Sequence, residues 1–179
     1  SESYPNRRST CREMRLHLHD ISYYGVTMTL PKRFRDTILA AQRSGHRVFA
    51  DMLRPLGLTP AWAEVLTTLQ ENGPLSIREL SHFLICEADH PSRLIKRMED
   101  KGFITRTPDP NDRRAVKLVL TESGEAAADK VAGIETGFNE WIEQRLNADN
   151  VSTTIQTLER LMKGTPEARS LENRYPDSH

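Results

Sequence analysis

Apolar side chains recur at three- and four-residue steps through most of this chain, which is the spacing of one face of a helix. The pattern predicts a first helix over residues 31–53, ended by Pro55 and Gly57. A second helix is expected after Thr59, a suitable N-cap, with Pro60 in its first turn. The inner face of this second helix is predicted to hold Trp62, Val65, Leu66 and Leu69.

The middle of the chain combines two more helices with two extended segments. Ser76 followed three residues later by Glu79 matches a capping box, so a short helix is expected there. After a turn, a fourth helix is predicted near residues 91–101, with Leu94, Ile95 and Met98 facing inward. Extended segments at 103–107 and 115–120 then flank a charged loop. This order predicts a mainly α fold with a small β-hairpin wing, a winged helix-turn-helix that addresses two grooves of a duplex.

The C-terminal third predicts helices that need a partner. An apolar stripe of about six turns follows Gly124, and no surface within one small winged helix covers so long a stripe. The first helix of a second copy is the economical cover, so we expect N- and C-terminal dimerisation helices. Asp149 or Asn150 is expected to cap a last helix, and residues 164–179 are predicted to be a polar tail. The stripe consists of Ala127, Val131, Ile134, Phe138, Trp141 and Leu146, and the last helix is expected to face inward with Val151, Ile155, Leu158 and Met162.

These patterns give a provisional division of the chain. Residues 1–30 are an N-terminal extension, partly ordered or forming an accessory helix, because their periodicity fits helix and strand equally. Residues 31–57 form the first dimerisation helix, 58–121 the winged helix-turn-helix region, and 122–163 the C-terminal dimerisation helices. A basic run in the extension is either a solvated tail or an arm that contacts phosphate; it comprises Arg7, Arg8, Arg12 and Arg15.

Charge is unevenly distributed although the formal net charge is +0. Residues 1–54 carry ten Lys and Arg against five Asp and Glu, and residues 74–121 carry nine against seven. Residues 122–179 carry six against eleven. This asymmetry fits a nucleic-acid binder with a separate assembly surface, and it also fits a chain whose ends merely differ in composition.

The two cysteines, Cys11 and Cys86, form no disulfide framework, so a reduced cytoplasmic setting is expected. No apolar run is long enough to cross a bilayer, and no membrane association is predicted. Motifs for a nucleophile elbow, a zinc protease or a phosphate-binding loop do not occur. We therefore predict a protein that is not an enzyme and holds no cofactor.

A metal or thiol switch is a minor alternative. His82, Cys86 and His90 stand four apart and would share one face of a continuous helix, but a predicted turn separates them. Sensor thiols need an electropositive setting, and Glu87 and Asp89 beside Cys86 disfavour one. No metal site is predicted.

The helix predicted near residues 91–101 is the first candidate for contact with DNA. Its outward side is predicted to hold Ser92, Arg93, Lys96 and Arg97. His90, at the start of the helix, is also expected to contact DNA. A guanidinium donates two hydrogen bonds to guanine O6 and N7, and a hydroxyl bonds to a base edge or a phosphate. The alternatives are an ordinary solvated helix face, or Arg93 pairing with an acidic neighbour to hold the fold.

Four motifs resemble the MarR family of bacterial transcriptional regulators. Asp112-Arg113-Arg114, five residues, then Leu120-Thr121 matches the wing signature D-x-R-x5-L-T of that family. The other three matches are the Leu58-Thr59 opening, Gly73-Pro74-Leu75-Ser76 and Lys101-Gly102-Phe103-Ile104.

The resemblance implies specific roles. Arg114 would enter the minor groove, held by a salt bridge from Asp112, and a narrow minor groove attracts arginine. Arg113 and Lys117 are expected to contact phosphate. Family members usually bind small aromatic or phenolic effectors in a crevice, which here would be lined by Trp62, Phe49 and His46.

We therefore expect a homodimeric, sequence-specific regulator of transcription that binds a pseudo-palindromic operator in double-stranded DNA. By the resemblance it would be a repressor that a small ligand releases. The alternatives are a winged-helix module that binds protein and not DNA, and a switch that responds to thiol oxidation or metal.

Overall fold

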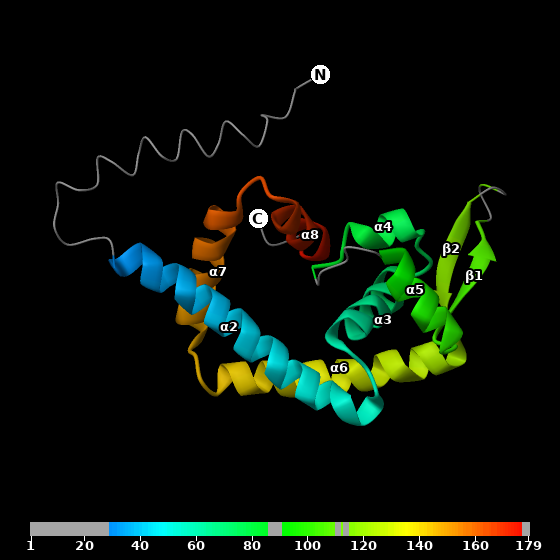
Figure 1. The fold of residues 1–179 in the computed structure, drawn as a ribbon, viewed down its shortest axis with the longest axis horizontal. Helices are drawn as coiled ribbons and strands as arrows, with labels where there is room; N and C mark the ends of the chain where they lie inside the picture. Colours follow the sequence, from blue (N-terminus) through cyan, green and yellow to red (C-terminus); the bar gives the residue numbers. More distant parts are fainter. Residues whose placement is uncertain (1–28, 86–90, 110–111, 113–114, 177–179) are drawn as a thin grey trace, which may run out of the picture. The chain divides into compact units, whose positions relative to one another are not determined.

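The computed structural model describes residues 29–85, 91–109, 112 and 115–176. It divides into two units, residues 1–45 and 46–179, and helix α2 runs through the boundary between them. The elements are α2 (Thr29–Leu53), the 3-10 turn η2 (Arg54–Leu56), α3 (Pro60–Asn72), α4 (Ile77–Ser81), α5 (Pro91–Asp100), β1 (Ile104–Pro108), β2 (Val116–Leu120), α6 (Glu122–Glu143), α7 (Ala148–Met162) and α8 (Pro166–Arg174) (Figure 1).

The described part of the first unit is the N-terminal portion of α2. Its apolar side chains are largely exposed: Leu30 is 66%, Phe34 43% and Leu39 53% accessible. Lys32 and Arg35 pair with Asp36 at 3.1 Å, and such exposed pairs contribute little to stability. The helix therefore presents exposed apolar residues in the described part of this unit.

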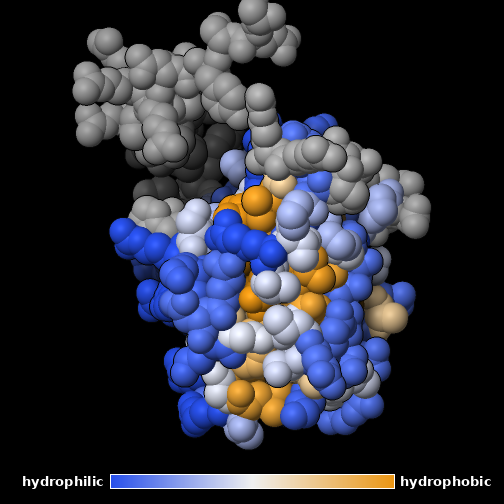
Figure 2. Space-filling view, turned by 90° about the vertical axis from the view of Figure 1, so that its right-hand side faces the viewer, coloured by the Kyte–Doolittle hydropathy of each residue, from blue (hydrophilic) through white to orange (hydrophobic). Residues whose placement is uncertain are grey.

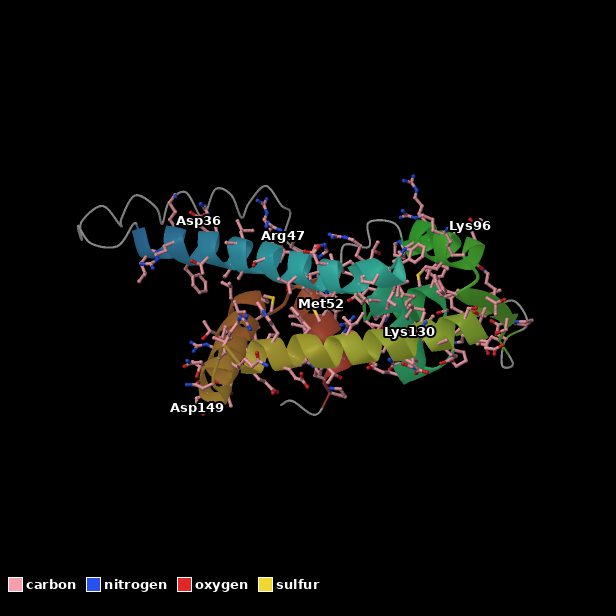
Figure 3. The ribbon with its side chains drawn as sticks, turned by 90° about the horizontal axis from the view of Figure 1, so that it is seen from below. Asp36, Arg47, Met52, Lys96, Lys130 and Asp149 are labelled. Atoms are coloured by element: carbon pink, nitrogen blue, oxygen red, sulfur yellow. The ribbon has the colours of Figure 1, made fainter. Side chains whose placement is uncertain are left out.

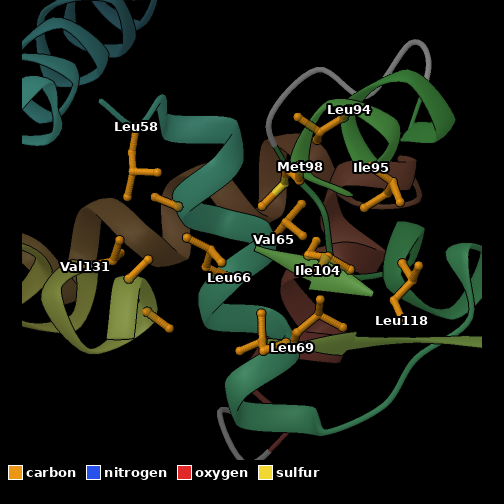
Figure 4. Packing of buried hydrophobic residues seen from close by; sticks show 14 of the residues in the cluster. Leu58, Val65, Leu66, Leu69, Leu94, Ile95, Met98, Ile104, Leu118 and Val131 are labelled. Carbon is orange, nitrogen blue, oxygen red and sulfur yellow. The ribbon is translucent and has the colours of Figure 1, made fainter. Parts of the chain in front are cut away.

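The core of the second unit surrounds α3. Val65 and Leu66 are fully buried, and they pack with residues from α5 and the wing (Figure 4). Met98 from α5 and Leu118 from β2 lie in the same cluster. The early part of α6 joins it through Val131. This shared core fixes α5 and the wing to the same scaffold.

The wing is a two-stranded antiparallel sheet. Its register pairs Ile104 with Leu120 and Pro108 with Val116. Leu75, just before α4, exchanges backbone hydrogen bonds with Leu118, at 2.7 and 3.3 Å. These two hydrogen bonds fasten the hairpin to the residue that lies just before α4.

Several local predictions are confirmed. Thr59 caps α3 by accepting the Trp62 N–H, and Ser76 and Glu79 form both hydrogen bonds of the capping box at α4. The helices expected at 31–53 and 91–101 appear as α2 and α5, and the two extended segments appear as β1 and β2. Expectations for residues 1–28 lie outside the described residues.

Two C-terminal predictions are wrong. Asn147, and not Asp149 or Asn150, caps α7 by accepting the Asn150 N–H at 2.8 Å. Residues 166–174 form helix α8 where a polar tail was expected. Thr165 caps α8 by accepting the Ala168 N–H at 3.2 Å, with proline in the first turn. A cap followed by proline starts a helix as readily as proline ends one.

The long apolar stripe of the C-terminal helices is only partly covered within one chain. Val131 is fully buried, whereas Leu146 is 49% exposed. On α7, Ile155 is 49% exposed and Leu161 is 62% exposed. Along the described ranges, no helix is both long and apolar enough to span a membrane.

Candidate nucleic-acid interface

Helix α5 separates its apolar and cationic residues cleanly. Leu94, Ile95 and Met98 are buried, as the sequence predicted. The other side of the helix is exposed, with Lys96 on its outer face (Figure 3). One open depression on this surface is lined by Ser92, Arg93, Lys96 and Arg97.

Ion pairs fix α5 and partly neutralise it. The Arg106 guanidinium of β1 donates to both oxygens of Glu99 on α5, at 2.7 and 3.2 Å, and this hydrogen bond raises the pKa of Arg106. Lys96 donates to Asp100 one turn along at 2.8 Å, which raises the pKa of its ammonium. The Arg106 pair binds the helix to the wing, and it is a contact that sequence reasoning missed. The sequence did contain a signal for this ion pair, because the acidic Glu99 and the basic Arg106 flank the turn between α5 and β1.

Lys117 has a different environment from the one expected. Its ammonium donates to both oxygens of Glu79, at 2.6 and 2.8 Å, and lies 3.7 Å from Asp109. The side chain is only 18% exposed. The hydrogen bond from Lys117 lowers the pKa of Glu79 to about 2, helped by the backbone N–H of Ser76. Lys117 therefore fastens the wing to α4, and this pairing does not support the expected phosphate contact.

The wing tip is described only in part. Asp112 is exposed, and its backbone carbonyl accepts the Ala115 N–H at 2.9 Å. Arg113 and Arg114, predicted to contact DNA, lie outside the described residues, as does His90. Their proposed roles stay predictions.

The residues expected to line an effector crevice have separate neighbours. Trp62 packs edge-on against Phe103, with ring centroids 5.9 Å apart. Phe49 packs against Phe138 at 5.5 Å, and His46 is exposed. Phe138 in turn stacks on another ring of α6, that of Trp141, at 5.6 Å, and the Arg145 guanidinium lies 4.2 Å from the Trp141 ring centre. Phe49 therefore gathers with Phe138 and Trp141 on the second half of α6, whereas Trp62 pairs with Phe103.

A buried ion pair was also missed from the sequence. Glu64 on α3 accepts the Ile85 N–H at 2.7 Å and pairs with Arg174 at the end of α8. Ile85 and Arg174 stand 21 and 110 residues away from Glu64 in the sequence, so spacing gives no signal for either contact. Within the described ranges, no group of three or more His, Cys, Asp or Glu side chains is placed to hold a metal ion. Cys11 and Cys86 lie outside those ranges.

The face at the wing end of the molecule is not uniformly hydrophilic. Figure 2 shows hydrophilic residues on both flanks of a narrower band of hydrophobic and neutral ones. Val116 on β2 is one exposed hydrophobic residue of this hairpin, at 43%. The polar surface of this face is therefore interrupted by apolar residues.

Comparisons with known proteins agree on one family. The MarR family model matches residues 58–116. The Escherichia coli multiple antibiotic resistance protein MarR is 28% identical over 117 residues, covering 65% of this chain and 79% of that protein. The regulator BilQ of Clostridioides difficile is 30% identical over 106 residues, covering 59% and 72%. A crystal structure of a MarR mutant from E. coli complexed with operator DNA shares the fold, with a TM-score of 0.66 and 24% identity over 78% of this chain and 99% of that one.

Proposed function

This chain belongs to the MarR family of transcriptional regulators, and we propose that it is a homodimeric, sequence-specific DNA-binding repressor released by a small aromatic ligand. The homologues are regulators and not enzymes, which agrees with the absence of catalytic motifs in the sequence. The similarity to a MarR structure holding operator DNA supports the choice of DNA as the partner.

The cationic face of α5 is the observation that carries this proposal. A helix whose apolar side is buried and whose outer side offers two arginines, a lysine and a serine can enter a major groove without disturbing the core. Arg93 and Arg97 lie one turn apart, a spacing that supports two bidentate donors reaching into one groove. The Glu99–Arg106 ion pair holds α5 against the wing, so α5 and the wing approach the duplex together.

The test begins with duplexes selected from a random pool by the purified protein. Arg97→Ala is expected to weaken binding to the selected duplex by about 1–3 kcal/mol and to relax the preference at one base position. Lys130→Ala, an exposed cation on α6, is the matched control and should bind as the parent does. Equal affinity of Arg97→Ala and the parent would remove α5 as the reading helix.

Salt separates this proposal from a winged-helix module that binds only protein. Each phosphate neutralised by the protein steepens the fall of log K with log salt by about 0.9. A dimer with several phosphate contacts therefore loses affinity steeply as salt rises. A chain that ignores every duplex at low ionic strength is instead a protein-binding module.

Homodimerisation is supported by apolar surface that a single chain leaves open. Exposed apolar side chains occur on α2 (Leu30, Phe34, Leu39), in the turn after α6 (Leu146) and on α7 (Ile155, Leu161). Such surface is unfavourable in water and marks an interaction site. Two copies would set their recognition helices about 34–36 Å apart, one turn of DNA. Analytical ultracentrifugation at micromolar concentration should give twice the mass of one chain, and a monomer would contradict the proposal.

Ligand release is supported by the aromatic cluster of Phe49, Phe138 and Trp141, which offers ring faces beside the Arg145 cation. A ligand weakens DNA binding only as far as it prefers a different spacing of the two recognition helices. Salicylate and phenol are suitable first probes, with quenching of tryptophan fluorescence as the readout. In Phe138→Ala the quenching should be lost while DNA binding is kept. A promoter fused to a reporter gene, with and without the protein, decides between repression and activation.

A further inference from the structure

Glu64 joins three segments that are far apart in the sequence. Its side chain on α3 is only 8% exposed. One carboxylate oxygen accepts the backbone N–H of Ile85 and also the guanidinium of Arg174. A carboxylate taken out of water is costly unless it is paired and hydrogen-bonded. Arg174 is the counter-charge that allows Glu64 to hold Ile85 at this depth.

The end of α8 also binds the chain just beyond α4. The Nε of Arg174 donates to the carbonyl of Phe83 at 2.7 Å, and the amide of Asn173 donates to the carbonyl of His82 at 2.9 Å. The last carbonyls of a helix have no partners within it, and a basic side chain there is favourable. Two side chains of α8 therefore donate hydrogen bonds to carbonyl groups at and just after the C-terminal end of α4, the first helix of the helix-turn-helix.

These contacts lie between α4 and the recognition helix in the sequence. His82, Phe83 and Ile85 belong to the stretch that leads from α4 toward α5. The other end of α8 is tied to α7 by a link of three residues, 163–165, which includes the left-handed Gly164 and the cap Thr165. A short, capped link leaves little freedom, so α8 connects α7 with the turn of the helix-turn-helix.

We propose that Arg174 and Asn173 are positioning residues for DNA recognition: through Glu64 and two backbone carbonyls, the C-terminal helix α8 fixes residues 82–85, which lead from α4 toward α5. This rests on the proposed DNA-binding function. It makes α8 part of the DNA-reading unit, although α8 lies more than sixty residues after α5 in the sequence.

The deciding variant is Arg174→Met, which keeps the length of the side chain and removes its charge and donors. Arg169→Met is the matched control, because Arg169 is exposed on the same helix and its side chain makes no hydrogen bond or ion pair with the residues that the structure describes. The probes are the duplex selected by the parent protein and a scrambled duplex of equal length. Both are measured at a temperature where hydrogen exchange shows each variant to be folded.

Arg174→Met should weaken binding to the selected duplex on the order of tenfold, a common size for coupling between separate parts of a protein. Its affinity for the scrambled duplex should stay unchanged, because phosphate contacts tolerate a small reorientation that base contacts do not. A purely structural role would lower the melting temperature and leave both affinities of the folded protein unaltered. Unchanged affinity for the selected duplex in Arg174→Met therefore overturns the proposal.

Two further variants cover the case in which Arg174→Met does not fold. Asn173→Ala removes only the bond to His82 and should shift the ratio of selected to scrambled affinity in the same direction by a smaller factor. Arg174→Lys keeps the charge and should recover part of the loss. If neither changes that ratio, α8 does not position α5.

Hydrogen exchange separates this inference from the proposed function. In Arg174→Met, the amides of Ile85 and α5 should exchange faster than in Arg169→Met, whether or not DNA is bound. If the parent protein binds no duplex, the proposed function is wrong. The hydrogen-exchange comparison then still tests whether α8 is attached to the residues before α5. Equal exchange rates in the two variants contradict the attachment.

Discussion

Gly124, the third residue of α6, lies where no larger side chain fits. A Cβ added there would stand 2.1 Å from the carbonyl oxygen of Phe103 and 3.3 Å from the Cβ of Leu120. Backbone atoms cannot turn aside as the end of a flexible side chain can. Gly124→Ala must therefore push α6 away from the start of the wing by about 1 Å, since a carbon and an oxygen in contact are about 3.3 Å apart.

The cost follows from what that displacement disturbs. Overpacking of a well-packed site costs about 1–3 kcal/mol. The same Phe103 carbonyl accepts the Thr121 N–H at 3.0 Å, and losing this bond costs about 1 kcal/mol. We therefore expect Gly124→Ala to lower the free energy of unfolding by about 2–4 kcal/mol. For a protein of this size the melting temperature falls by about 2–4 °C per kcal/mol.

Gly133 on the same helix supplies the control. Nothing lies within 4 Å of a Cβ built at Gly133, and the residue is exposed. Gly133→Ala should stabilise the protein by about 0.5–1 kcal/mol, because alanine loses less backbone freedom in a helix. Thermal unfolding followed by circular dichroism compares the two variants with the parent. If Gly124→Ala melts at or above the parent temperature, the close approach to Phe103 is wrong.

Two further predictions concern acidic residues. The pKa of Glu79 is lowered to about 2 from 4.5, so its pairing with Lys117 stabilises the fold fully above pH 4.5 and is lost as the pH falls toward 2. Urea unfolding between pH 2 and 5 should show this slope in the parent and a flatter one in Glu79→Gln. Burial raises the pKa of Glu135, and nearby Glu71 adds to the effect, so its charge opposes folding at neutral pH. Glu135→Gln should raise the melting temperature at pH 7 and have little effect at pH 3; a lower melting temperature at pH 7 contradicts this reasoning.

Local signals carried most of the sequence prediction. Thr59-Pro60 and the capping box of Ser76 and Glu79 each act within four residues, so they are readable without knowledge of the fold. The buried side of α5 followed from periodicity alone, and the burial of Leu94, Ile95 and Met98 confirms it. The same reasoning placed the cationic residues of α5 on its outer side.

Contacts between distant segments could not be predicted from the sequence. Glu64 and Arg174 meet only because α8 folds back, and α8 itself was mistaken for a tail since Thr165-Pro166 was read as a stop. Lys117 was assigned to phosphate because a cation on a wing strand is expected to face DNA. The structure shows its ammonium paired with Glu79, a tertiary contact that the sequence did not indicate, and the phosphate contact stays a prediction.

The same pairing shows why a count of charges overstates the cationic surface of residues 74–121. Arg106 forms an ion pair with Glu99, and Lys117 forms one with Glu79. Lys96 forms an ion pair with Asp100 at 2.8 Å. The Lys96–Asp100 pair is exposed on both sides, at 68% and 59%, so it contributes little to stability and can open at low cost.

Asp100 should therefore restrain DNA binding, because Lys96 must leave it to reach a phosphate and because the carboxylate itself repels a polyanion. We expect Asp100→Asn to bind both selected and scrambled duplexes more tightly. The slope of log K against log salt should steepen by up to about 0.9, the value for one added phosphate contact. The selectivity between the two duplexes should not rise, since a phosphate contact carries no sequence information. Tighter binding of the selected duplex alone would assign Lys96 to a base and not to the backbone.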